Sequence, residues 1–181
     1  MRILGGSAKG RKIFTLKNND VRPTGAKVRA AIFNMIAPHI YDSVFLDAFA
    51  GSGAMGIEAL SRGAQKSIFL DINAASIQMI KKNVKNIDFE LKSFIRKENF
   101  FYFIRQNNSK FDIIFADPPY AMDGIHDIVL KVEDANSLND EGLLIIEHDY
   151  NIILNEGKKL ILVKQKKYSG TMVSIYERTY K

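Results

Sequence analysis

The sequence predicts an α/β domain, built on a mostly parallel sheet covered by helices on both faces, with an antiparallel hairpin at the C-terminal end. Two observations predict this fold. After residue 43, short apolar segments of strand length alternate with amphipathic segments of helical length. The segment 158–180 instead holds two strand-like runs separated by Ser169-Gly170, a pattern typical of a β-hairpin.

Each element follows from its own residues. Glycines at positions 5, 6 and 10 punctuate residues 1–21 and predict a short hairpin extension, which precedes one domain over 22–181. Pro23-Thr24 and Pro38 bracket an expected helix, whose apolar positions recur at helical spacing. The expected strands are 44–50, 66–72, 93–96, 111–117 and 142–148, and the further helices are 53–63, 75–86, 99–106 and 124–134.

Composition excludes several classes of protein. The 181 residues are 46% hydrophobic and 25% charged, which is typical of one globular domain. The chain has no cysteine, so it has no disulfides and no thiolate metal sites. It also lacks an apolar run of the roughly 18–20 residues that span a bilayer, and lacks the apolar core of a signal peptide. We therefore expect a cytoplasmic protein.

The positive charge is concentrated at the start of the chain. The net charge is +6. Residues 1–30 hold eight Lys or Arg and one acid, whereas positive and negative charges are nearly equal in number in the remaining residues. Such a cluster indicates a surface for phosphate groups, with a simple solvated face as the alternative. The candidate nucleic-acid contacts are Lys9, Arg11, Lys12, Arg22, Lys27 and Arg29.

A glycine-rich loop follows the first expected strand. Gly51, Gly53 and Gly56 form the pattern G-x-G-x-x-G between a strand and a helix, where small residues let the backbone approach a ligand closely. Asp71 ends the next strand 20 residues later, where a carboxylate can hold two ribose hydroxyls. A nucleoside-containing cofactor is therefore expected, and Ser52 and Ile72 complete the contacts near the loop and the acid.

The cofactor could be a dinucleotide or S-adenosylmethionine. Asp47 lies inside the apolar strand, four residues before Gly51. A carboxylate there would repel the pyrophosphate of a dinucleotide, whereas it could accept hydrogen bonds from an ammonium group or its waters. The sequence therefore favours S-adenosylmethionine, which carries an ammonium group and no phosphate.

The segment Asp117-Pro118-Pro119-Tyr120 directly follows the fourth strand. Two prolines have fixed φ angles and cannot continue a sheet, so they stiffen this strand end. A carboxylate and a rigidly aimed Pro118 carbonyl can accept hydrogen bonds from an exocyclic amine, while Tyr120 offers a face on which a base can stack. This arrangement predicts methylation of a nucleobase amine, for which a base in a helix must be flipped out.

Four stretches, in this order and spacing, resemble a known family: RILGGSAKGRKI, RPTGAKVRAAIFNMI, LDAFAGSGAMGIEALSRGA and FADPPY. The chain is similar to the RsmD-type 16S ribosomal RNA (guanine-N2)-methyltransferases. The resemblance implies a Rossmann-like, seven-stranded class I methyltransferase fold with an N-terminal β-hairpin that contacts RNA. It also implies S-adenosylmethionine as cofactor and, as substrate, a guanine of small-subunit ribosomal RNA in an assembled or assembling 30S subunit. We expect a monomer.

The chain departs from the family in places. The family's usual RPTTDRVRE is here Arg22 to Ala30, without its Thr-Asp pair and closing Glu. Glu98 stands where an Asp is usual and is assigned to the adenine amine of the cofactor, with Asn99 as a close competitor. His39, His126 and His148 are scattered and predict no metal site.

Three other functions remain open at this point. The same amine chemistry would serve a DNA adenine-N6 methyltransferase, although the chain leaves little room for a target-recognition domain. A protein glutamine methyltransferase usually has Asn in place of Asp117. A non-catalytic RNA-binding assembly factor could also have kept the fold.

Overall fold

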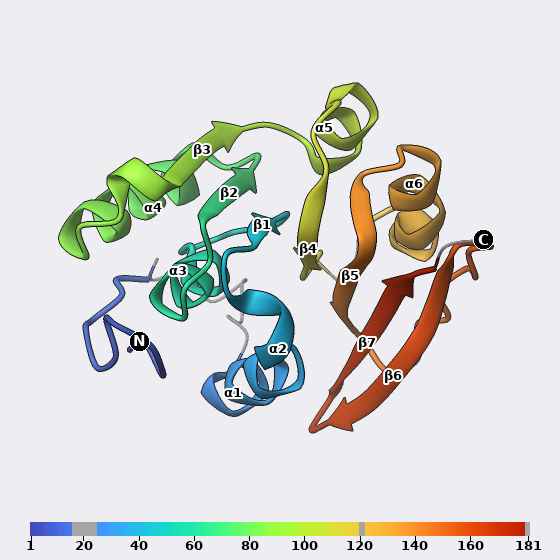
Figure 1. Ribbon diagram of the computed structural model, residues 1–181, viewed down its shortest axis with the longest axis horizontal. Helices are drawn as coiled ribbons and strands as arrows, with labels where there is room; N and C mark the ends of the chain where they lie inside the picture. The colour runs from blue at the N-terminus through green and yellow to red at the C-terminus, as the bar shows by residue number, and fades with distance from the viewer. Residues whose placement is uncertain (16–24, 120–121, 180–181) are drawn as a thin grey trace.

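A seven-stranded sheet forms the centre of the molecule (Figure 1). The computed structural model describes residues 1–15, 25–119 and 122–179, in which the strand order is β3-β2-β1-β4-β5-β7-β6. The strands are β1 (Val44–Asp47), β2 (Lys66–Asp71), β3 (Ser93–Lys97), β4 (Phe111–Ala116), β5 (Leu138–His148), β6 (Leu160–Tyr168) and β7 (Thr171–Arg178).

Parallel pairing brings five strand ends to one edge of the sheet. Strands β1 to β5 pair in parallel, whereas β7 pairs antiparallel with both β5 and β6. The predicted mostly parallel sheet with an antiparallel C-terminal hairpin is therefore confirmed. The carboxyl ends of β1 to β5 lie along one edge, which we name the carboxyl edge, and ligands of open α/β sheets bind there.

Helices cover both faces, as Figure 1 shows. They are α1 (Ala26–Met35), α2 (Ala37–Ile40), α3 (Ala54–Ser61), α4 (Ala74–Asn86), α5 (Phe100–Gln106) and α6 (Ile128–Asp134), with 3-10 helices η1 (Glu90–Lys92) and η2 (Ile125–Asp127). Alternate strand residues feed two cores. Phe45, Phe69 and Phe115 pack in a first core with residues of α1 to α4. The side of the sheet that this core covers is named the first face. Leu46, Leu70 and Ile114 pack in a second core with residues of α5 and α6.

Some boundaries differ from those the sequence predicts. Strand β1 ends at Asp47 rather than at residue 50, because the backbone of Ala48 to Ala50 turns away to bond with the neighbouring strands. Pro38 was expected to end a helix, but it lies in the first turn of α2. Proline is tolerated there because the N–H groups of a first helical turn have no intrahelical partner. The start of the first helix at Pro23-Thr24 lies outside the described residues.

The first 15 residues are part of the packed structure. One antiparallel bridge joins Arg2 and Lys12, which closes a short hairpin-like turn. Ile3, Ala8 and Ile13 are buried in the first core together with residues of α3 and α4. The division of the chain at residue 21 stays a prediction.

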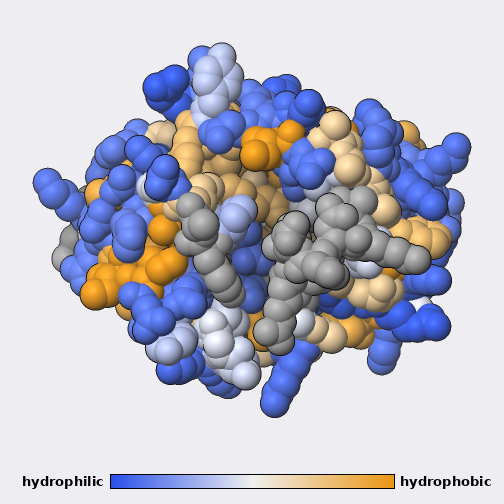
Figure 2. All heavy atoms as spheres, turned by 180° about the vertical axis from the view of Figure 1, so that it is seen from behind, coloured by the Kyte–Doolittle hydropathy of each residue, from blue (hydrophilic) through white to orange (hydrophobic). Residues whose placement is uncertain are grey.

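The surface is largely polar. On the face that Figure 2 shows, hydrophilic side chains occupy most of the rim and apolar side chains gather in patches between them. Within the described ranges, no helix is both long and apolar enough to cross a membrane.

Candidate functional site

The glycine loop crosses the carboxyl edge between two strands. The N–H of Ala48 donates to the carbonyl of Phe115 (2.9 Å), and that of Ala50 donates to the carbonyl of Leu70 (2.8 Å). Gly51 and Gly53 have φ angles of 53° and 79°, in the left-handed region that favours glycine. The loop is thus held against the ends of β4 and β2 at once.

Gly56 sets the distance between α3 and β2. A Cβ atom at Gly56 would lie 2.3 Å from Cε1 of Phe69 and 2.4 Å from Oγ of Ser67, which is closer than atoms can approach. A Cβ at Gly51, by contrast, would meet nothing within 4 Å. The third glycine of the pattern therefore serves helix packing, and the first leaves room at the loop surface.

Asp47 lies beneath the loop, where its side chain is buried. Its Oδ2 accepts a hydrogen bond from the N–H of Gly56 (2.9 Å) in the first turn of α3. Burial raises the pKa of Asp47 from 3.8 to about 7; the Gly56 hydrogen bond opposes this shift, and the negative charge of Asp71 adds to it. A cation at the loop would favour the ionised carboxylate, which is consistent with the predicted role of Asp47 towards an ammonium group.

Asp71 is oriented by two backbone donors. The N–H of Gly51 donates to its Oδ2 and the N–H of Asn73 to its Oδ1, each at 2.8 Å. Each carboxylate oxygen keeps a second lone pair for a ligand hydroxyl. Ile72, the next residue, is 68% exposed and offers an apolar surface beside the carboxylate. These residues fit a cofactor with an adenosyl group, the ribose on Asp71 and the base on Ile72.

Glu98 and Asn99 differ in what their side chains already bind. The backbone N–H of Glu98 donates to the carbonyl of Asp71 (3.1 Å), and its carboxylate lies 3.6 Å from Arg96. Oδ1 of Asn99 caps α5 by accepting from the N–H of Tyr102 (3.1 Å). Because an adenine amine needs an acceptor, the geometry favours Glu98, and this assignment stays a prediction.

The Asp117-Pro118-Pro119 segment leaves β4 beside the glycine loop. Asp117 is half-buried, Pro118 is buried and Pro119 is exposed, with the Pro119 carbonyl accepting from the N–H of Met122 (2.8 Å). Asp117 lies two residues after Phe115, so strand alternation gives both side chains the first face, as it does for Asp71 and Phe69. The candidate acids therefore share one edge and one face. Tyr120 lies outside the described residues.

The predicted RNA contacts differ in their exposure and in what they bond to. Lys9, Lys12 and Lys27 are exposed, and Arg22 lies outside the described residues. Arg11 bonds to the carbonyls of Asn86 and Ile87 and to the carboxylate of Asp88, at the C-terminal end of α4.

Arg29 is not available to RNA, so that prediction is wrong. Its side chain is only 1% exposed, and it donates to the carbonyl of Arg2 and to Sδ of Met1, each at 2.7 Å. The helical position of Arg29 turns its side chain into the first core, where it anchors the N-terminal segment.

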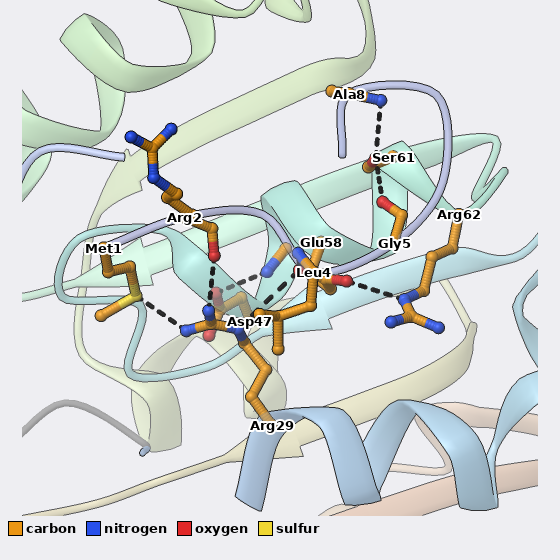
Figure 3. A network of polar contacts seen from close by, with 11 residues as sticks. Met1, Arg2, Leu4, Gly5, Ala8, Arg29, Asp47, Glu58, Ser61 and Arg62 are labelled. Carbon is orange, nitrogen blue, oxygen red and sulfur yellow. Dashed lines mark hydrogen bonds and ion pairs between the residues drawn. The ribbon is translucent and has the colours of Figure 1, made fainter. Parts of the chain in front are cut away.

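Glu58 joins that segment to α3, as Figure 3 shows. Its buried carboxylate accepts from the N–H of Leu4 (2.8 Å) and from Nε of Arg62 (2.8 Å), and it lies 3.8 Å from Nε of Arg29. Ser61, one turn further, donates to the carbonyl of Gly5 (2.6 Å). This network was not predicted from the sequence, since Glu58 looks like any helix-surface acid.

Asn83 makes a second connection, also missed by the sequence analysis. Its buried amide donates to the carbonyl of Ser52 in the glycine loop (2.8 Å) and to the carbonyl of Phe14 (2.9 Å), and its Oδ1 accepts from the N–H of Phe14 (2.8 Å). Asn83 follows Ile80 by three residues and so lies on the apolar stripe of its helix. A polar residue on such a stripe was the available signal.

The sheet order, the glycine loop and the acids at the carboxyl edge define a class I S-adenosylmethionine-dependent methyltransferase. The family model described as "Conserved hypothetical protein 95" matches residues 1–177. The chain belongs to this family, the RsmD-type methyltransferases, as its motifs predict.

Known relatives are similar over nearly the whole chain. "Putative rRNA methyltransferase YlbH" of Bacillus subtilis is 34% identical over 98% of this chain and 99% of its own length. "Ribosomal RNA small subunit methyltransferase D" of Haemophilus influenzae is 31% identical over 98% of this chain and 93% of its own length. The solved structure "Putative methyltransferase yhhF from Escherichia coli" is 31% identical, with a TM-score of 0.88 over 100% of this chain and 99% of that one.

Proposed function

We propose that this protein transfers a methyl group from S-adenosylmethionine to the exocyclic N2 amine of a guanine in small-subunit ribosomal RNA. The observation that supports this most directly is the position of Asp117-Pro118 beside the glycine loop. Phe115, two residues before Asp117, bonds to that loop through Ala48. An amine acceptor and a cofactor loop are thus neighbours, and the relatives named as ribosomal RNA methyltransferases indicate the class of substrate.

S-adenosylmethionine, when bound, supplies a methyl group already activated on a positively charged sulfur. The chain's own residues position the reactants. The Asp117 carboxylate accepts one N–H of the target amine and the Pro118 carbonyl accepts the other, which aims the nitrogen lone pair at the methyl carbon. After transfer, the Asp117 carboxylate takes the proton that the methylated amine releases. The Asp71 carboxylate holds the ribose hydroxyls, and Ile72 supports the adenine.

We further propose that the substrate is RNA within an assembled or assembling 30S subunit in the cytoplasm, and that the enzyme acts as a monomer. Comparing methyl transfer to naked ribosomal RNA and to purified subunits tests the first statement, and analytical ultracentrifugation tests the second.

Methyl transfer to small subunits from a strain that lacks this gene tests the reaction. Subunits are incubated with the protein and isotopically labelled S-adenosylmethionine, and the labelled nucleoside is identified by mass spectrometry after digestion. We expect N2-methylguanosine at one position. Label in adenine of added DNA would support the DNA methyltransferase instead, and no binding of S-adenosylmethionine in isothermal titration would support a non-catalytic assembly factor.

Asp117→Asn tests the role of the carboxylate. We expect methyl transfer to fall at least about 100-fold, because an amide is a weaker acceptor and cannot take up the proton. Cofactor affinity should stay within a few-fold of wild type. Asp134→Asn, at an exposed position at the end of α6, is the matched control and should leave turnover unchanged. Turnover retained in Asp117→Asn would refute the assigned role.

A further inference from the structure

The hairpin of β6 and β7 turns at the carboxyl edge. Strand β6 is the edge strand of the sheet, and its register relates it to the candidate active site. Ala116 pairs with Ile146, so the next residue, Asp117, is level with Glu147. Glu147 pairs with Val173, and Val173 pairs with Lys166. Asp117 and Lys166 therefore lie in one row across β4, β5, β7 and β6, three strand spacings or roughly 14 Å apart.

Lys164 and Lys166 lie on the same face as Asp117. Cross-strand partners share a face of a sheet, and these two lysines pair with Ile175 and Val173. Both partners pack in the first core, to which Phe115 of β4 also belongs. A ligand that reaches Asp117 from the first face thus passes near these lysines.

The charge of the hairpin is available for binding. Strand β6 carries Lys164, Lys166 and Lys167 and no acidic residue, and all three lysines are exposed. No ion pair between residues that the structure describes includes a lysine. Two of the lysines lie beside aromatic rings. Nζ of Lys166 lies 5.5 Å from the ring centroid of Tyr168, and Nζ of Lys167 lies 3.7 Å from that of Tyr150.

Among the described residues, Arg11 and Arg29 near the N-terminus do not supply this charge at the same place. Arg29 is buried, and Arg11 is bonded at the C-terminal end of α4, which is the end away from the carboxyl edge. Figure 1 shows the N-terminal segment beside α3, well apart from the hairpin of β6 and β7. Among the residues that the structure describes, the cation in the row of Asp117 is Lys166 of the hairpin.

We propose that Lys164 and Lys166 form a second RNA-binding surface, which holds backbone phosphates next to the target nucleotide while its base enters the pocket. The inference rests on the proposed function and adds a contact surface to it. It commits to RNA because two exposed lysines, one of them beside the ring of Tyr168, suit a phosphate backbone with unstacked bases. Two lysines on one face, spaced along the strand, can each neutralise one phosphate.

The test is the double variant Lys164→Glu/Lys166→Glu of the full chain. We expect at least a 10-fold weaker affinity for small-subunit ribosomal RNA and a similarly raised KM for subunits. The slope of log affinity against log salt should fall by about 1.4 to 1.8, the value for two lost phosphate contacts. The affinity for S-adenosylmethionine should match wild type, because the candidate cofactor residues lie at the ends of β1 and β2 and not on β6.

Lys92→Glu/Lys110→Glu is the matched control, with the same change of charge at two exposed lysines. These residues precede β3 and β4, at the opposite edge of the sheet. The control should bind RNA with at most a few-fold loss, and with the wild-type salt slope.

The experiment distinguishes a failure of RNA binding by Lys164 and Lys166 from a failure of the proposed methyl transfer. Lysines that only protect a sheet edge are replaced equally well by glutamates, so wild-type RNA affinity in Lys164→Glu/Lys166→Glu overturns the inference. An equal loss in the control also overturns it, because the effect is then one of net charge. If the wild-type protein binds RNA but methylates no guanine, the proposed function fails and the binding data still decide on the lysines. A wild-type protein that binds no RNA overturns both.

Discussion

Replacing Glu58 by Gln should destabilise the protein strongly, although Glu58 contacts neither cofactor nor substrate. Glu58 is fully buried and faces Arg29, which is 1% exposed, with 3.8 Å between Oε2 and Nε. At an effective dielectric constant of about 20, two unit charges at this separation attract by about 4 kcal/mol. The pair with Arg62 is shorter, at 2.8 Å, but Arg62 is 22% exposed, so water screens this pair more. Removing one partner of a buried pair is known to cost about 3–5 kcal/mol, which agrees with the value for Arg29.

The assay is equilibrium unfolding in urea, followed by circular dichroism. We expect the free energy of unfolding of Glu58→Gln to fall by about 3–5 kcal/mol, a large part of the roughly 5–15 kcal/mol that is usual for a domain. Arg62→Gln, at the residue that follows α3, is the matched control and should cost less than Glu58→Gln, because Arg62 is the more exposed partner and Arg29 still compensates Glu58. The amide oxygen that Glu58→Gln introduces can still accept from the N–H of Leu4, whereas its NH2 group faces Nε of Arg62, so the loss includes that hydrogen bond as well as the charge.

A double variant decides between an ion pair and general loss of packing. Glu58→Gln/Arg29→Met removes both charges, so its cost should be at least about 2 kcal/mol smaller than the sum of the two single costs. Additive costs, or a loss below about 1 kcal/mol in Glu58→Gln alone, would refute the argument that this buried pair holds the N-terminal segment.

Asp47 and Gly56, beneath and within the glycine loop, should each affect the stability of the protein. The pKa of Asp47 is raised from 3.8 to about 7 in the folded state, so the folded protein binds this proton more tightly than the unfolded chain does. Asp47 therefore makes the protein less stable as the pH rises from about 4 to 7, and it adds no further change above pH 7. Between about pH 5 and pH 8, wild type should therefore lose about 2–3 kcal/mol relative to Asp47→Asn in urea unfolding, and an equal pH dependence of the two proteins would contradict the raised pKa. Gly56→Ala should lower the free energy of unfolding by about 3 kcal/mol, because its Cβ would meet the ring of Phe69 and Oγ of Ser67. Gly25→Ala, where nothing lies within 4 Å and φ is −59°, should cost less than about 0.5 kcal/mol, and equal costs at both glycines would show that packing against β2 is not the reason.

Local patterns were sufficient for most of the fold. Strands such as Phe111–Ala116 are short apolar runs between turn residues, and α4 has apolar residues at helical spacing, so their type was predictable. The boundaries were less so, because β1 ends where Ala48 and Ala50 bond to other strands. Long-range hydrogen bonds of this kind have no signal in the local sequence.

The site was predictable to the same extent. Gly51, Asp71 and Asp117 stand at strand ends in the sequence, and parallel pairing then brings them to one edge. Arg29 was assigned to RNA because it belongs to the cluster of positive charge in residues 1–30. Only the packed structure shows that the first core surrounds it and that Glu58 compensates its charge.

The order of strands and helices, the glycine loop and the acids at strand ends could be predicted from the amino-acid sequence, because these depend on residues close together in the chain. Which cations are exposed and which chain segments meet depends on the packed fold. Arg29 joins the N-terminal segment to Glu58, and Lys166 reaches the row of Asp117 only through the pairing of four strands. Burial and strand register are properties of the assembled chain, and a linear pattern of charges contains neither.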